Sequence, residues 1–233
     1  MSEPLPPPTP DAAGWRPPPP PAGPTPYRAA PSATRSAGLR TATTVLFWCA
    51  AASTVALAGA LAFRKNVWSD IEDAGVVVGD ITRLQDADDA VGAVGAIVAV
   101  IGLATTIVLS IWSLRVARRA RAAGASNVSP GLACGGWYIP FANAIVPFVQ
   151  LRRAGDHERR PLGRLNAWQG LFIATAVLAL VLNGPGDVDS AESVDDLSGR
   201  LDVQVLAGVG IAAVALLMAY FATRALRDLD PPT

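Results

Sequence analysis

The segment from 130 to 150 carries the most distinctive chemistry of this chain, and it contains no charged residue. Trp137 and Tyr138 each join an apolar ring to one polar atom, which suits a membrane boundary with the ring buried and the polar atom hydrated. Pro140 and Pro147 lack a backbone donor and disfavour helix at the residue before them. We therefore expect either a broken helix at the inner surface of a membrane or a shallow re-entrant turn packed on a bundle of helices that cross it. The candidate residues of this motif are Trp112, Arg115, Pro130, Trp137, Tyr138, Pro140, Asn143 and Pro147.

Arginines flank this uncharged segment on both sides. A basic side chain close to an anionic leaflet contributes about 1 kcal/mol to membrane association before salt screening. The sequence therefore predicts that these arginines bind anionic lipid headgroups. The candidates are Arg115, Arg118, Arg119, Arg121, Arg152 and Arg153.

Groups that could support catalysis or metal binding are few and poorly arranged. His157 is the only histidine and lies among charged residues, as a solvated loop residue would. The acidic cluster at 86–89 offers oxygen ligands for a hard cation but lacks the spacing and the glycine of a calcium loop. Cys49 and Cys134 are expected to be small apolar fillers, although a redox or ligand role for Cys134 stays an alternative. We expect no enzymatic activity, no catalytic residue, no metal and no cofactor.

Four uncharged stretches must position these residues, at about 41–63, 90–114, 165–183 and 203–223. A helix rises about 1.5 Å per residue, so roughly 20 apolar residues cross a bilayer core of about 30 Å. The stretches are apolar on all sides, unlike the amphipathic helices of a soluble core. The sequence predicts an all-α fold, an integral membrane bundle of four helices within 41–227, with the broken element between spans 2 and 3.

The charges are separated by the spans although the formal net charge is zero. Fifteen of the 19 basic residues lie in the N-terminal tail, the segment 115–164 and the C-terminus, whereas 13 of the 19 acidic residues lie in the other two loops. Basic loops stay in the cytoplasm. We therefore expect a multi-pass protein of the cytoplasmic (inner) membrane with both termini cytoplasmic. A fifth span at 130–150 would invert this pattern in the second half of the chain.

The N-terminal segment 1–40 is rich in proline and poor in apolar side chains. Such a chain cannot form a core, so we expect a disordered cytoplasmic tail with polyproline II character at 17–21. It could dock a cytosolic protein or act as a solvated spacer. Residues 228–233 are expected to form a short C-terminal tail.

Apolar residues also recur at helical spacing in the first outer loop, which predicts an amphipathic helix resting on the outer interface. They are Val67, Ile71, Val78, Ile81 and Leu84.

Several short motifs resemble the bacterial membrane protein family named domain of unknown function 4328. They are the run from Trp112 to Arg118, then Gly124, Ser129-Pro130-Gly131, the run from Gly136 to Asn143, and Pro147. The resemblance covers about Thr41 to Arg227 and implies four spans, frequently with a proline-rich tail, and an uncharacterised activity. In that resemblance Arg119 replaces an expected asparagine, and Ile145-Val146 replaces a more polar pair.

These features favour a non-enzymatic membrane scaffold or accessory protein that binds anionic lipids and a cytosolic partner on its inner face. Homo-oligomerisation is possible through small residues on the helices. We expect no role in nucleic-acid binding. The alternative is a small transporter or channel in which the broken 135–147 element is a gate.

The topology predicts a labelling pattern. In a background lacking Cys49 and Cys134, a cysteine at Ser69 or Ser193 should react with a membrane-impermeant maleimide on intact cells, and one at Ser126 should react only after lysis. Labelling at Ser126 without lysis would contradict the four-span topology.

Overall fold

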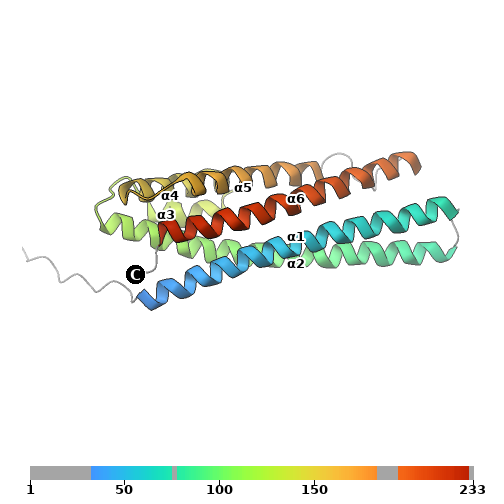
Figure 1. Cartoon of the computed structure of the whole chain (residues 1–233), viewed down its shortest axis with the longest axis horizontal. Coiled ribbons are helices and arrows are strands. Elements are labelled where there is room, and N and C mark those ends of the chain that lie inside the picture. Colours follow the sequence, from blue (N-terminus) through green and yellow to red (C-terminus); the bar gives the residue numbers. More distant parts are fainter. Residues whose placement is uncertain (1–32, 75–77, 183–193, 231–233) are drawn as a thin grey trace, which may run out of the picture. The chain divides into compact units, whose positions relative to one another are not determined.

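The computed structural model describes residues 33–74, 78–182 and 194–230, and all regular elements among them are helical (Figure 1). The α-helices are α1 (Ala33–Ala74), α2 (Val78–Ala122), α3 (Pro130–Gly135), α4 (Val146–His157), α5 (Gly163–Leu182) and α6 (Val194–Leu229). Two 3₁₀ turns, η1 (Gly136–Tyr138) and η2 (Ala142–Ala144), lie between α3 and α4. The all-α class expected from the sequence is confirmed.

Three helices in the described part of the chain are long and apolar enough to cross a membrane, judged by length and composition. They are Gly38–Ala74, Ile81–Ala122 and Leu197–Leu229. The expected spans 41–63, 90–114 and 203–223 lie within them. The expected span 165–183 coincides with α5, which is not one of the three, and residue 183 lies outside the described residues. A fourth span therefore stays a prediction.

Proline placement explains where the helices are continuous and where they break. No proline occurs from 33 to 129, and α1 and α2 extend over 42 and 45 residues. Pro130 begins α3 and Pro147 lies in the first turn of α4, where a missing N–H costs nothing. Helix α2 ends at Ala122, and the φ of 101° at Gly124 lets Ala125 N–H donate to Ala120 O, the bond that closes a Schellman motif.

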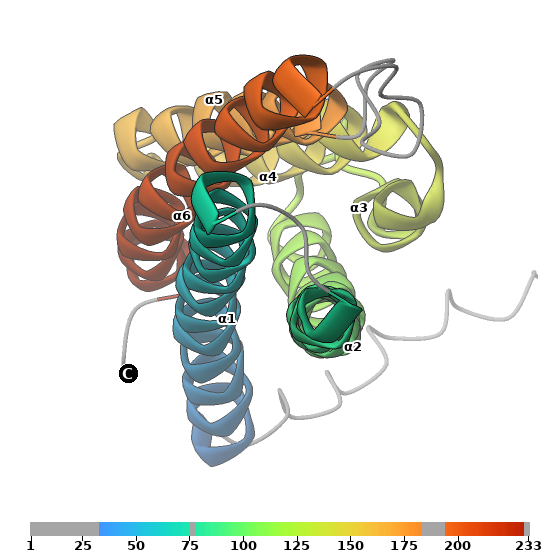
Figure 2. The ribbon, with the colours of Figure 1, turned by 90° about the vertical axis from the view of Figure 1, so that its right-hand side faces the viewer.

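The long helices of residues 33–230 lie side by side (Figures 1 and 2). Helix α1 packs against α2 and α6, and α5 packs against α6. Helices α3 and α4 pack against α2 and against each other, and α4 and η2 also contact α5. The start of α1 and the ends of α2 and α6 lie at one end of this group, together with α3 and α4. We call this the basic end, and the other the acidic end.

The helices continue past the boundaries expected from the sequence. Helix α1 begins at Ala33, within the segment 1–40 expected to be disordered, and residues 1–32 lie outside the described residues. Helix α6 continues to Leu229, within the expected tail 228–233, of which 231–233 are not described. The extra turns are charged, so helix length here exceeds the length of the apolar stretch.

The prediction of an amphipathic helix resting on the outer interface is wrong. Helix α1 instead continues to Ala74, and helix α2 begins at Val78. Most of the expected loop therefore consists of two helices that pack against each other. Val67 and Ile71 are buried against Ala87, with Leu84 packed beside them. The apolar spacing is real, but the partner that covers it is the neighbouring helix.

Ion pairs join the helices at the acidic end. Arg64 Nε lies 2.5 Å from Asp88 Oδ1, which joins α1 to α2, and Lys65 forms an ion pair with Asp202 of α6. Arg64 and Lys65, two of the four basic residues that depart from the charge separation, are thus paired with carboxylates of adjacent helices.

Candidate functional site

Residues 130–157 form a helical hairpin at the basic end, which we call the basic-end hairpin. Its first arm runs antiparallel to the end of α2. Val128 O, just before this arm, accepts from Arg121 Nη1 at 3.0 Å. Ten residues later, the Tyr138 hydroxyl lies 2.9 Å from Ser110 Oγ. The chain therefore moves along α2 from Arg121 towards Ser110 before it reverses.

The second arm, α4, returns beside α5. Near the reversal, Gln169 Nε2 of α5 donates to Ala144 O at 2.7 Å. Arg152, farther along α4, donates through Nε to Asn166 Oδ1 at 2.7 Å and also bonds Gln169 Oε1. Asn166 and Gln169, near the start of α5, are thus partnered by the hairpin, whereas Arg164 pairs with Asp228 of α6.

The two arms are also joined to each other. Gln150 is 3% exposed, and its Oε1 accepts from Ser129 N–H at 2.8 Å. Ser129 Oγ caps α3 by accepting from Leu132 N–H. Pro130 follows this cap as the first residue of α3.

A cluster of aromatic side chains fills the space between the hairpin and the long helices. Trp137 of η1 stacks on Trp168 of α5 with ring centroids 6.2 Å apart. Phe148 of α4 meets Trp168 edge-on at 5.0 Å, and Phe47 of α1 does so at 5.5 Å. Edge-to-face and offset stacking are the favourable geometries for aromatic pairs. The cluster joins α1, η1, α4 and α5 through one fully buried indole, that of Trp168.

The prediction that the polar atom of Trp137 is hydrated is wrong. Its ring is 5% exposed, and its Nε1 donates to Ser113 Oγ of α2 at 3.1 Å in a buried bond. The crossing helix supplies the partner that water was expected to supply. Trp112, the first residue of the motif, is buried in the same core. Tyr138, in contrast, is half exposed.

Close approach of neighbouring side chains favours glycine at Gly136. A Cβ there would lie 3.1 Å from both Pro147 Cδ and Val146 Cγ1, closer than side chains normally pack. Pro147 is buried at this contact, whereas Pro140 is exposed and Asn143 is partly buried. The motif residues around 136 and 147 therefore allow η1 to lie against α4.

The reversal of the hairpin is strained at Phe141. Its φ of 62° and ψ of −38° are near a γ-turn geometry, and Ala142 N–H donates to Pro140 O at 2.7 Å across it. Such a conformation costs a residue other than glycine about 1–3 kcal/mol. Phe141 is nevertheless 90% exposed, so the turn displays a large apolar side chain at an energetic cost.

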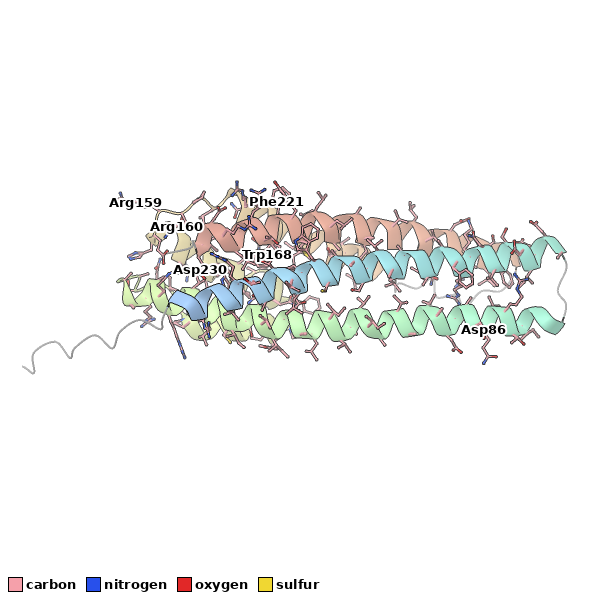
Figure 3. All side chains as sticks on the ribbon, turned by 60° about the horizontal axis from the view of Figure 1, so that its bottom comes forward. Asp86, Arg159, Arg160, Trp168, Phe221 and Asp230 are labelled. Carbon is pink, nitrogen blue, oxygen red and sulfur yellow. The ribbon has the colours of Figure 1, made fainter. Side chains whose placement is uncertain are left out.

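Arg119 joins three helices at the basic end. Its Nε lies 3.1 Å from Glu158 Oε1, just after α4, and its Nη1 lies 2.7 Å from Asp230 Oδ1, just after α6. Arg40 of α1 donates to Asp230 O at 2.7 Å, and Arg160 lies 3.4 Å from Glu158. Figure 3 places Asp230 and Arg160 at this end and Asp86 at the other.

The six arginines proposed to bind headgroups differ in their surroundings. Arg119 and Arg152 are held by side chains of neighbouring helices, as described above. Arg115 and Arg118 are exposed on α2. Arg121 and Arg153 are exposed and each donates to the backbone of the 122–129 loop, at Val128 O and Asn127 O. Headgroup binding by these residues stays a prediction.

Sequence reasoning missed the partners of the motif. Trp168, Gln169, Glu158 and Asp230 were not identified as site residues. The spacing of polar residues at the start of α5, Arg164, Asn166 and Gln169, was a usable signal, because such groups at the start of an apolar helix need partners. Among the described residues, no group of three or more His, Cys, Asp or Glu side chains could hold a metal ion.

The two serine contacts of α2 predict different effects of one substitution. Ser113→Ala should destabilise the protein by about 1–3 kcal/mol, because it leaves the buried Trp137 N–H without a partner. Ser110→Ala is the matched control and should cost less, because the half-exposed Tyr138 hydroxyl can bond elsewhere. Thermal unfolding in one detergent measures both variants, and equal losses would contradict the assigned role of Ser113.

Comparison with protein families gives one match. The family described as "Domain of unknown function (DUF4328)" matches residues 77–229, which is 153 of the 233 residues and includes the whole basic-end hairpin. The match begins after α1, whereas the resemblance seen in the sequence was drawn from Thr41. No curated protein and no solved structure is significantly similar to the chain. The chain belongs to the domain of unknown function 4328 family.

Proposed function

We propose that the protein is a non-enzymatic scaffold or accessory protein of the cytoplasmic membrane, with four spans and both termini in the cytoplasm. The apolar helices and the charge separation support this topology. On this orientation the basic end, with its hairpin, faces the cytoplasm.

The fourth span would be α5, and the hairpin makes this physically reasonable. The part of α5 that follows Asn166 and Gln169, residues 170–182, is mostly apolar and rises only about 20 Å, less than a bilayer core of about 30 Å. Its polar first turns must therefore lie at membrane depth. Groups there need partners within the protein. Asn166 and Gln169 have them, in Arg152 and Ala144 O.

The observation that carries the scaffold proposal is the interlocked basic end. Arg119 ties α2 to the ends of α4 and α6, and Trp168 ties the hairpin to α1 and α5. Exposed arginines, among them Arg115 and Arg118, also lie towards the basic end. A rigid surface with cationic side chains at its edge is suited to gathering anionic lipids and presenting a tail to a cytosolic partner.

Lipid binding is testable with a charge-matched pair of variants. Arg115→Gln with Arg118→Gln should lower the enrichment of phosphatidylglycerol over phosphatidylcholine on the purified protein several-fold, because each arginine contributes about 1 kcal/mol. Native mass spectrometry measures the enrichment.

The control for this experiment carries Arg83→Gln with Arg200→Gln, which removes the same charge at the acidic end. It should retain the enrichment. An equal effect of the two pairs would mean that net charge, and not the basic end, attracts the lipid.

The proposed cytosolic partner predicts a second outcome. Deleting residues 1–32 leaves α1 intact, since that helix begins at Ala33. Proline-rich segments bind aromatic grooves. A cytosolic protein that co-purifies from native membranes with the full chain should therefore be lost from the deleted form. If the same proteins co-purify with both forms, the tail is a spacer.

A transporter is the second candidate, and the position of the hairpin favours it. Tyr138 and Ala144 contact residues within the expected spans, as a re-entrant gate would. A gate must move, however, and Trp137 and Phe148 are buried in the aromatic cluster. The packing therefore supports the scaffold more strongly.

A further inference from the structure

The reversal of the hairpin exposes a group of large apolar side chains. Ile139, Phe141 and Ile145 are 51%, 90% and 57% exposed. We call these three residues the apex patch. Such a patch is unfavourable in water and is typical of a surface that contacts a membrane or another protein.

Two contacts give the level of the apex patch along the bundle. Tyr138, beside Ile139, bonds Ser110, which lies four residues inside the expected end of the second span. Ala144, beside Ile145, accepts from Gln169, four residues inside the expected start of the third span. Four helical residues rise about 6 Å, so both neighbours place the apex at a similar depth below the membrane boundary.

Exposed apolar side chains also lie on the neighbouring helices, near the residues that contact the hairpin. On α2, Ile107 and Ile111 flank the Ser110 contact in sequence and are 43% and 40% exposed. On α5, Ile173 lies one turn beyond Gln169 and is 42% exposed. Arg115, in contrast, lies about one and a half turns from Ser110 towards the basic end. The sequence of groups along the bundle is thus cationic, then apolar, as across a lipid leaflet.

We propose that the basic-end hairpin is re-entrant and that the apex patch lies among the lipid acyl chains just beneath the headgroups, with Phe141 as its most inserted side chain. The strained γ-turn at Phe141 carries a side chain that is 90% exposed, so the apex presents this ring to its surroundings. Lipid chains cover such a patch without shape complementarity. The inference rests on the proposed membrane insertion of the bundle.

Spin-label accessibility tests the proposal on the full chain in phosphatidylcholine and phosphatidylglycerol vesicles. Nitroxides are attached at Phe141→Cys and Ile145→Cys, separately, after Cys49→Ala and Cys134→Ala. Two further sites are controls: Ser126→Cys, exposed in the loop after α2, and Val100→Cys, exposed in the middle of α2. Collisions with oxygen report lipid, and collisions with a water-soluble nickel chelate report water.

Labels at 141 and 145 should collide with oxygen several-fold more than with nickel, with a ratio between those of Val100 and Ser126. Nickel accessibility equal to that at Ser126 would place the apex in water. Low accessibility to both reagents would mean that a second copy or another protein segment covers it. Either result overturns the proposal. High nickel accessibility at Val100 would instead show that the bundle itself does not insert.

Labels at two positions of the apex patch show whether a result at one of them comes from a local change in the backbone. A cysteine at 141 retains the strained φ, whereas Ile145 has a φ of −124° and tolerates any side chain. If only the 141 label reports water while 145 reports lipid, Phe141 is not the inserted group, and that part of the proposal is wrong.

Discussion

A polar group removed from water is costly without a hydrogen-bond partner, and partners inside the protein fix the basic-end hairpin on its neighbours. The requirement is not met everywhere, because the buried Nε1 atoms of Trp112 and Trp168 have no partner among the described residues. The indole N–H of Trp137 is buried and donates to Ser113, which fixes the first arm of the hairpin on α2. The side chain of Gln169 bonds both Ala144 O and Arg152, which fixes the second arm on α5. Helices α2 and α5 thus hold the hairpin from two sides.

Buried aromatic rings hold the hairpin in addition to the hydrogen bonds. Trp168 contacts side chains of α1, η1 and α4, so a change in any of these elements disturbs the others. Close packing of this kind leaves little freedom for a gate between 135 and 147. The proposed scaffold role follows from this restriction, because a fixed hairpin can present the same surface to lipids and partners at all times.

The arginines serve two different purposes. Arg119 forms ion pairs with Glu158 and Asp230, whose side chains are only 15% and 14% exposed, so its charge is used within the protein. Arg118 is exposed and available to the surroundings. A charge count by loop treats both residues as equal contributions to topology, although Arg119, which is also exposed, is paired with two carboxylates of the protein.

The sequence by itself determined the helical class, the apolar stretches behind the three candidate spans, the family, and the opposed charges of the two ends. These properties depend on composition and on spacing along one chain. It also shows the prolines and glycines of 130–150, which act on their own backbone. Only the tertiary structure decided that Val67 and Ile71 pack on α2, that Trp137 bonds Ser113, and that Arg119 pairs with Glu158 and Asp230. Those outcomes depend on which helices become neighbours, and no local pattern of residues contains that information.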